Sequence, residues 1–291
     1  MSYILHIAII LQIYIILALS LNVKTGFTGL LSLCQAAFYG TGAYVVTILM
    51  VNHNFNFLTA LFMAIVFNVF INGVLISLFA TRLRNLYFTL ASLAFQIIFF
   101  GVIYNWQGLT QGSYGITGIP KPTVFGIEFS SHILFFVITS FFTVTTLAFF
   151  HFFPKSPLCR MLQCVRDDEV WMVALGKNPA YFKFIGISIS AVFASIAGGL
   201  YATYMSYIDP TCFTLDESIL ILTIILIGGT GNIIGPISGA ILYVLLPEFL
   251  RFVNLPDALA ANVRMIIYAM ILLLIIRLKP NGLFGRFEIK G

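Results

Sequence analysis

The chain has 291 residues, of which 60% are hydrophobic and only 9% are charged, and its mean hydropathy is +1.03. Soluble domains carry roughly 25% charged residues, so this composition excludes an ordinary soluble enzyme or binding domain. The formal net charge of +5 comes from Lys and Arg at the ends of apolar runs, as in membrane topology signals, and not from a basic stripe that would bind nucleic acid. We therefore expect an all-α, polytopic bundle in contact with the lipid bilayer.

Apolar runs divide the chain into about nine predicted membrane spans, with eight to ten possible. A helix needs roughly 20 residues to cross the hydrocarbon, so the run 216–229 is short and either crosses or re-enters. No basic region and cleavage site of a signal peptide precede the first run, so we expect it to be retained as a span. The predicted spans are 3–21, 30–51, 55–80, 86–104, 132–153, 182–207, 216–229, 233–251 and 263–278.

The distribution of positive charge favours the crossing of 216–229. With nine spans and an outside N-terminus, one side receives few basic groups: His53, Lys121, His132 and Arg251. The other side receives Lys24, Arg82, Arg84, five basic residues within 154–183, and Arg277, Lys279, Arg286 and Lys290. By the positive-inside rule the second side is cytoplasmic and includes the C-terminus. We expect residues 1–291 to form a single transmembrane domain with a cytoplasmic segment at 154–183.

The segment 154–183 carries eight of the 25 charged residues. Ser156 can cap a helix that has Pro157 at its first position. Leu158, Met161, Leu162 and Val165 then share one helical face. Asp167 or Asp168 can cap a second helix, which the left-handed residue Gly176 would end. Asn178 and Pro179 repeat the start signal, so a pair of short amphipathic helices is predicted between two spans.

Small residues recur within the spans at intervals that suit helix packing. Ala191, Ser195, Gly199 and Thr203 follow one another every four residues, as do Gly231, Gly235 and Gly239. The turn 26–29 (GFTG) also resembles 228–231 (GGTG) near the other end of the chain. Transporters often interrupt corresponding helices with glycine to expose backbone groups to a substrate, but coincidence or ordinary turn chemistry explains this short match better.

The sequence lacks the motifs of a self-sufficient enzyme or pump. It has no GxxxxGK[ST] phosphate-binding loop, no HExxH and no GxSxG. Its four cysteines include no CxxC and are interpreted as small apolar fillers. The spans contain almost no acidic groups, which a proton- or sodium-coupled carrier normally needs. We therefore expect no catalytic, metal or cofactor site in this chain, and an energy source on another subunit.

A series of short motifs runs through the chain in a fixed order, and it resembles the LivM-type permease subunits of branched-chain amino acid ABC importers. The resemblance covers the chain nearly end to end. At 34–35 the chain reads Cys-Gln where such permeases commonly have Gly-His. The motifs lie at 19–22 (LSLN), 26–33 (GFTGLLSL), 36–38 (AAF), 40–44 (GTGAY), 82–88 (RLRNLYF), 166–169 (RDDE), 174–176 (ALG), 197–201 (AGGLY), 228–231 (GGTG) and 280–285 (PNGLFG).

The resemblance implies a permease subunit of the bacterial inner membrane that imports branched-chain or other hydrophobic amino acids. The implied partners are a LivH-like second permease, two ABC ATPase subunits that bind the ATP, and a periplasmic or surface-tethered substrate-binding protein. That binding protein would contact the outside loop 105–131, unless this is a plain turn-rich loop. A urea or amide permease and an ATP-independent secondary carrier remain alternatives.

The resemblance also implies site residues. Those expected to couple to the ATPase are Arg166, Asp167, Asp168, Glu169, Ala174, Leu175 and Gly176. Those expected to line the translocation path are Gly26, Gly29, Gln35, Gly228, Gly229 and Gly231.

Overall fold

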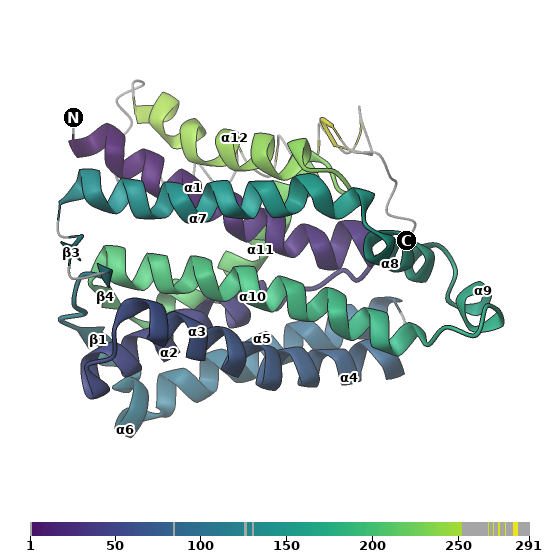
Figure 1. The fold of residues 1–291 in the computed structure, drawn as a ribbon, viewed down its shortest axis with the longest axis horizontal. Coiled ribbons are helices and arrows are strands. Elements are labelled where there is room, and N and C mark those ends of the chain that lie inside the picture. Colours follow the sequence, from purple (N-terminus) through teal and green to yellow (C-terminus); the bar gives the residue numbers. More distant parts are fainter. Residues whose placement is uncertain are drawn as a thin grey trace.

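The computed structural model describes residues 2–83, 85–124, 127–129 and 131–251, together with residues 267, 270, 273, 277 and 282–284. The predicted span 263–278 falls almost entirely outside these residues, as do Arg84, Lys279, Arg286 and Lys290. Most of the helices lie along the long axis of the molecule (Figure 1). The longer helices are α1 (Ser2–Asn22), α2 (Gln35–His53), α3 (Phe57–Asn68), α4 (Val74–Arg82), α5 (Asn85–Asn105), α7 (His132–Phe152), α8 (Pro157–Asp167), α10 (Pro179–Met205), α11 (Leu215–Gly228) and α12 (Ile234–Arg251).

The shorter elements continue or connect these helices. Two are π-helical turns, η1 (Val23–Phe27) after α1 and η2 (Val69–Gly73) between α3 and α4. The remaining short helices are α6 (Gln107–Thr110), η3 (Gly112–Tyr114), η4 (Phe153–Lys155), α9 (Glu169–Ala174) and η5 (Pro210–Phe213). The strands are β1 (Ile116–Thr117), β2 (Thr123–Val124), β3 (Ile127–Glu128) and β4 (Tyr207–Ile208).

The predicted all-α membrane bundle is confirmed. Five helical stretches of the described chain are long and apolar enough to cross a membrane, and each matches a predicted span: Tyr3–Phe27, Phe57–Arg82, Leu86–Asn105, His132–Lys155 and Pro179–Met205. Three further predicted spans fold as α2, α11 and α12. Of these, α2 is more polar, with Gln35, Thr41 and Thr47 buried, and α11 has only 14 residues.

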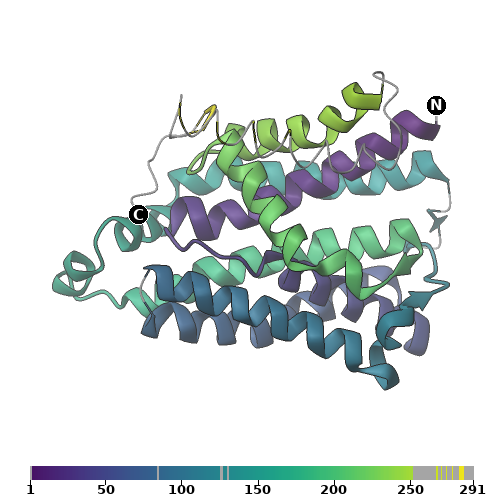
Figure 2. The same cartoon turned by 180° about the vertical axis from the view of Figure 1, so that it is seen from behind.

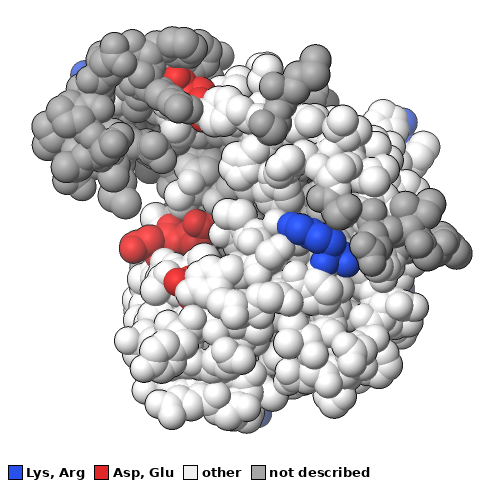
Figure 3. Space-filling model, turned by 90° about the vertical axis from the view of Figure 1, so that its left-hand side faces the viewer, with Lys and Arg blue, Asp and Glu red and all other residues white. Residues whose placement is uncertain are grey.

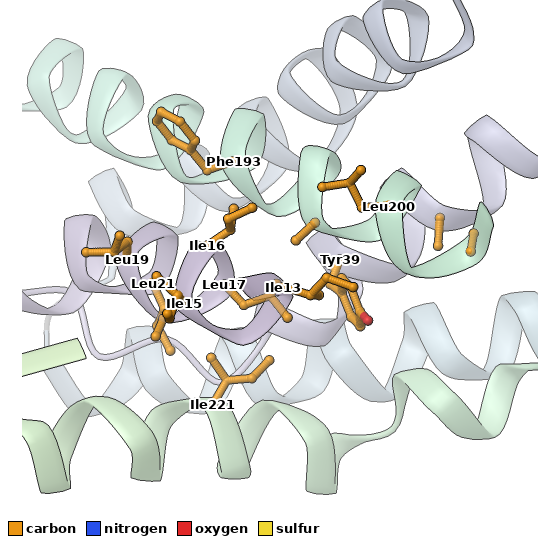
Figure 4. Packing of buried hydrophobic residues seen from close by; sticks show 14 of the residues in the cluster. Ile13, Ile15, Ile16, Leu17, Leu19, Leu21, Tyr39, Phe193, Leu200 and Ile221 are labelled. Carbon is orange, nitrogen blue, oxygen red and sulfur yellow. The ribbon is translucent and has the colours of Figure 1, made fainter. Parts of the chain in front are cut away.

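Helix α1 lies at the centre of the bundle. It is mostly apolar, and from Ile13 to Asn22 almost every residue is buried, as expected of a helix enclosed by others. Figure 4 shows its side chains Ile13, Ile16 and Leu17 between Phe193 of α10 and Ile221 of α11, and the first three are at most 1% exposed. Lipid is as apolar as these side chains, so close packing, and not removal from water, stabilises the contact.

Helices α2 and α10 approach each other closely through small residues. A Cβ atom added to Gly42 would lie 2.5 Å from Cα of Ser195, so any side chain there would separate the two backbones. Asn68 of α3 joins both helices, since its Nδ2 donates to the carbonyl of Phe38 at 2.7 Å and to Oγ of Ser195 at 2.6 Å. The predicted packing role of the row from Ala191 to Thr203 is thus seen at Ser195.

Two of the transmembrane elements are interrupted in the same manner. After η1, residues 28–34 are not helical and lead to α2, and after α10, residues 206–214 lead through β4 and η5 to α11. Helices α2 and α11, which follow the two interruptions, are called the restarting helices. They meet inside the bundle, where the amide of Ala36 donates to Oγ of Ser218 at 2.8 Å. Side chains of α5 bond to the first interruption: Ser92 accepts from the amide of Leu33, and Thr89 donates to the carbonyl of Leu31. Such partners allow non-helical backbone at membrane depth.

The position of the second interruption shows whether residues 216–229 cross the bundle or re-enter it. Helix α11 starts beside the start of α2 and ends next to η1, where the amide of Gly231 donates to Oδ1 of Asn22 at 3.0 Å. Strand β4, which precedes α11, lies at the other end of the molecule, and Figure 2 shows α11 passing diagonally between the two ends. The segment 206–228 therefore crosses the bundle, although only its second part is helical.

The two ends of the bundle differ in structure. The end that carries η1, α8 and α9 is called the α9 end, and the opposite end is called the β4 end (Figure 1). At the β4 end, β1 pairs with β4 in antiparallel register, with Ile116 opposite Ile208. The loop 105–131 is thereby attached to the backbone that leads into α11.

Candidate functional site

The helix-start signals predicted in 154–183 are all present. Oγ of Ser156 accepts from the amide of Cys159 at 3.1 Å, and Oδ1 of Asp168 accepts from the amide of Val170 at 2.8 Å. Oδ1 of Asn178 accepts from the amide of Ala180 at 3.0 Å, at the start of α10. Each cap supplies an acceptor for an otherwise unpaired amide, so the chain makes two short helices, α8 and α9, before α10.

Helix α8 packs against the bundle along one face. Cys159, Leu162 and Val165 are at most 3% exposed, whereas Leu158 and Met161, predicted for the buried face, are only partly buried. The buried face is therefore centred on Cys159, Leu162 and Val165, which follow one another every three residues. Burial raises the pKa of the Cys159 thiol to about 11, although the nearby Arg166 guanidinium opposes this.

Helix α9 presents its apolar residues to the outside of the molecule. Val170, Trp171, Val173 and Leu175 are 60–72% exposed, and only Met172 is buried. Figure 1 shows α9 projecting beyond the ends of the long helices. Adjacent exposed apolar side chains on an ordered helix are typical of a docking surface. The predicted element of Ala174, Leu175 and Gly176 ends this helix, with Gly176 at φ +70° and open space around it.

An ion pair and a helix cap hold the start of α9. The Lys183 ammonium is 2.6 Å from Oε1 of Glu169 and donates to the carbonyl of Ala80 at 2.8 Å, which ties α9 to α10 and α4. Asp167 pairs with Arg166 at 2.9 Å, and Asp168 is the helix cap. Of the predicted coupling residues, Asp168 and Glu169 thus hold the start of α9. Arg166 and Asp167 pair with each other on α8, and Leu175 is exposed.

Arg166 connects α8 to the first interrupted element. Its Nη1 donates to the carbonyl of Gly26 in η1 at 2.9 Å. Gly29 has φ +73°, a left-handed conformation that favours glycine, and a Cβ there would lie 2.5 Å from Cγ of Arg166. The arginine thus lies directly on the glycine turn 26–29.

The two glycine turns that resemble each other are in contact. Nδ2 of Asn22 donates to the carbonyl of Asn232 at 2.7 Å, and its Oδ1 accepts from the amide of Gly231. A Cβ on Gly26 would lie 2.5 Å from the same amide nitrogen. Residues 22–29 and 228–232, together with Arg166, are called the glycine junction below, and they lie at the α9 end.

The remaining predicted path residues divide between the junction and the interior of the bundle. Gly228 and Gly229 continue the junction, where the amides of Leu283 and Phe284 donate to the carbonyls of Ile227 and Gly228. Gln35 lies apart, at the start of α2, with its Nε2 donating to Oγ of Ser20 at 2.6 Å. The structure therefore brings five of the six predicted residues together.

A second polar site, built around Gln96 of α5, lies where α2 and α11 start. Its Oε1 accepts from the amide of Ala37 at 2.8 Å and from Oγ of Ser218 at 3.2 Å. Its Nε2 donates to the carbonyl of Phe213 at 2.9 Å. This single side chain joins both restarting helices to α5, and it is fully buried.

Reasoning from sequence did not predict the buried positions of two charged residues, one in η1 and one at the start of α11. Lys24, expected on the cytoplasmic side from its charge, is 0% exposed within η1 and so lies inside the protein. Glu217 lies in the first turn of α11, partly buried, and accepts from the hydroxyl of Tyr14 at 2.9 Å. The expectation of spans almost without acidic groups therefore fails at α11. Both residues stand at the ends of apolar runs, where sequence alone does not distinguish an interface position from an interior one.

Among the described residues, no group of three His, Cys, Asp or Glu side chains could hold a metal ion. The four cysteines are free, with Cys34 and Cys159 buried and Cys164 exposed.

Comparison with known proteins assigns the family. A family model described as "Branched-chain amino acid transport system / permease component" matches residues 3–276. Proteins named "High-affinity branched-chain amino acid transport system permease protein LivM" from Salmonella typhimurium and Escherichia coli are each 33% identical over 271 residues, covering 85% of this chain and 64% of theirs. A "Probable branched-chain amino acid transport permease protein LivM" from Methanocaldococcus jannaschii is 25% identical over 223 residues, covering 74% of this chain and 64% of its own.

The chain thus spans 64% of the length of these relatives, and no solved structure matches it significantly. The resemblance to LivM-type permeases is confirmed by the extent of the family match and by the identity to both bacterial proteins. The chain belongs to the family of branched-chain amino acid transport system permease components.

Proposed function

We propose that this chain is the membrane-spanning permease subunit of an ATP-driven importer and that an ATPase subunit docks on α9. The observation that carries the proposal is the exposed apolar face of α9, held in a fixed position at one end of the bundle. An apolar helix face that fits a groove on a partner is a common mode of protein recognition.

The arrangement of contacts supports a route from the docked partner to the membrane spans. A displacement of α9 moves α8, because only Asp168 separates the two helices. Arg166 of α8 then pulls on the carbonyl of Gly26, and Asn22 passes the movement to Gly231 and the start of α12. ATP binding and hydrolysis on the partner would in this way rock the interrupted helices against each other.

In this proposal the chain lies in the bacterial inner membrane with its α9 end in the cytoplasm. The N-terminus is then outside. The β4 end faces outward and presents separate acidic and basic groups on a largely uncharged surface (Figure 3). Lys121 belongs to this end, and its Nζ donates to the carbonyl of Tyr204 at 2.8 Å, while partial burial lowers its pKa. A substrate-binding protein docks there and a second, LivH-like permease completes the path.

The proposed cargo is a branched-chain or other hydrophobic amino acid, following the names of the relatives. The ATP is bound by two ATPase subunits, so this chain contributes the path and no hydrolysis. A single transmembrane domain with its coupling segment at 154–183 suffices for that role.

The two tryptophans of the chain provide a matched test. Trp171 on α9 and Trp106 at the β4 end are 71% and 53% exposed. Trp171→Asp should prevent the ATPase subunits from co-purifying with the tagged permease and abolish ATP-driven uptake in proteoliposomes. Trp106→Asp should leave co-purification of the ATPase unchanged. Full retention of the ATPase by Trp171→Asp would refute docking on α9.

A further inference from the structure

We propose that Lys24 and the start of α2 form an internal binding site for the carboxylate group of the transported amino acid, an inference that rests on the proposed function. Lys24 is 0% exposed, and its Nζ has no hydrogen-bond partner. The carboxylates of the two ion pairs found in the described chain, Asp167 and Glu169, belong to Arg166 and Lys183. An ammonium group carries three donors, so this side chain is left with none of them satisfied.

The aromatic contact of Lys24 does not replace a counter-ion. The ammonium lies 3.9 Å from the centroid of the Phe38 ring. A ring face attracts a cation, but it offers one weak contact where an ammonium needs three acceptors. Burial of an unpaired charge opposes folding, and inside a membrane protein such groups mark binding or transport sites.

The position of the ammonium makes an anion the fitting ligand. Phe38 belongs to the first turn of α2, a helix of 19 residues whose preceding residue, Cys34, provides no side-chain cap. The N-terminus of a helix carries partial positive charge, which repels a nearby ammonium. The amides of Ala36 and Ala37 already donate to Ser218 and Gln96, so an anion here would be held by the Lys24 ammonium and attracted by the helix dipole.

Polar side chains lie near Lys24 in the sequence and at the start of α2. Gln35 is fully buried, and its Nε2 bonds to Ser20, which lies four residues before Lys24 on α1. Oγ of Ser32 lies 3.2 Å from Sγ of Cys34. The hydroxyl of Thr25, next to Lys24, is buried without a partner. Hydroxyl and amide donors of this kind can share a carboxylate with the ammonium.

The site is also placed where the coupling segment can open it. Lys24 belongs to η1, and Arg166 of α8 contacts both Gly26 of η1 and Gly29 of the following turn. Since Lys24 is completely enclosed, a substrate reaches it only when η1 and the segment 28–34 move. Movement of α8 therefore exposes the ammonium to the cargo and covers it again.

The test uses the whole complex and three variants. Lys24→Met keeps the length of the side chain without its charge, and Lys24→Arg keeps the charge. Lys183→Met is the matched control, because Lys183 is buried as well but is paired with Glu169 and Ala80. Thermal unfolding is measured without ATP, with isovalerate as a branched-chain carboxylate probe and isopentylamine as the probe that lacks a carboxylate.

We expect isovalerate, but neither isopentylamine nor sodium chloride, to raise the Tm of the wild-type complex, since a ligand that binds only the folded state stabilises it. Lys24→Met should raise the Tm without ligand, because it removes an unpaired buried charge, and should lose the isovalerate effect. Lys183→Met should lower the Tm and keep that effect. ATP-driven leucine uptake should fall about tenfold or more in Lys24→Met and recover partly in Lys24→Arg.

Three results would overturn the site. These are an equal isovalerate response in wild type and Lys24→Met, a Tm loss in Lys24→Met like that of Lys183→Met, and stabilisation by chloride alone. A wild-type complex without ATP-driven uptake would refute the proposed function instead, and the isovalerate measurement does not depend on it.

Discussion

At the scale of single residues, the glycine junction depends on backbone conformations that other residues rarely adopt. Gly29 combines φ +73° with a close approach to Arg166. Gly101 of α5 offers a contrast, since a Cβ there would meet nothing within 4 Å and its helical conformation suits alanine. The two glycines therefore separate the effect of the junction from the general effect of adding a methyl group.

We predict opposite effects on stability for the two substitutions. Gly29→Ala should cost about 1–2 kcal/mol, because an L-residue is strained in the left-handed region, and displacement of Arg166 should lower ATP-driven uptake as well. Gly101→Ala should stabilise by up to about 1 kcal/mol through helix propensity. Thermal unfolding of both variants in detergent measures the difference. An unchanged Tm in Gly29→Ala would show that the turn adapts and that the junction is not tightly packed.

At the scale of elements, α8 and α9 were predictable from sequence because their start signals are local. Ser156, Asp168 and Asn178 each bond to an amide two or three residues away, so the chemistry that begins each helix is contained in its own sequence. The interruption at 28–34 was not predictable in this way. Its apolar residues suit a helix equally well, and the groups that bond to its backbone, Ser92 and Thr89, come from α5.

The orientation of α8 gives a pH-dependent prediction. Cys159 lies on the buried face and Cys164 on the exposed face of the same helix. With a pKa of about 11, roughly one Cys159 thiol in a thousand is ionised at pH 8, and the thiolate is the reactive form. In variants that keep a single cysteine, N-ethylmaleimide should therefore modify Cys164 quickly and Cys159 slowly.

The rate for Cys159 should rise about tenfold for each pH unit between 7 and 10, because the thiolate fraction does. Mass spectrometry of the intact chain measures both rates. Denaturation in detergent should make the two cysteines equally reactive, which serves as the control. Equal rates in the folded protein would mean that the stripe of Cys159, Leu162 and Val165 does not pack against the bundle.

At the scale of the whole molecule, the two interrupted elements run in opposite directions and meet twice. Their restarting helices meet at Gln96, and their glycine turns meet at Asn22. Hydropathy predicted the segments that cross the bundle, because it depends only on the composition of each apolar run. It could not predict the contacts between the two interrupted elements, because these join residues about 180–210 positions apart. The burial of Lys24 could not be predicted for the same reason, because it depends on the packing of η1 against distant parts of the chain.

This architecture makes the orientation in the membrane a test of the whole proposal. Tyr114 at the β4 end is 81% exposed, and Lys177 at the α9 end is exposed as well. On a cysteine-free background, a membrane-impermeant maleimide added to intact cells should label Tyr114→Cys but not Lys177→Cys. Lysed cells, in which both positions are accessible, provide the control.

The reverse labelling pattern would place α9 outside, where no ATP-hydrolysing subunit could dock on it. Labelling of both positions in intact cells would contradict the opposite placement of the two ends. Labelling only at Tyr114→Cys would leave α9, Arg166 and the glycine junction on the side where ATP is available.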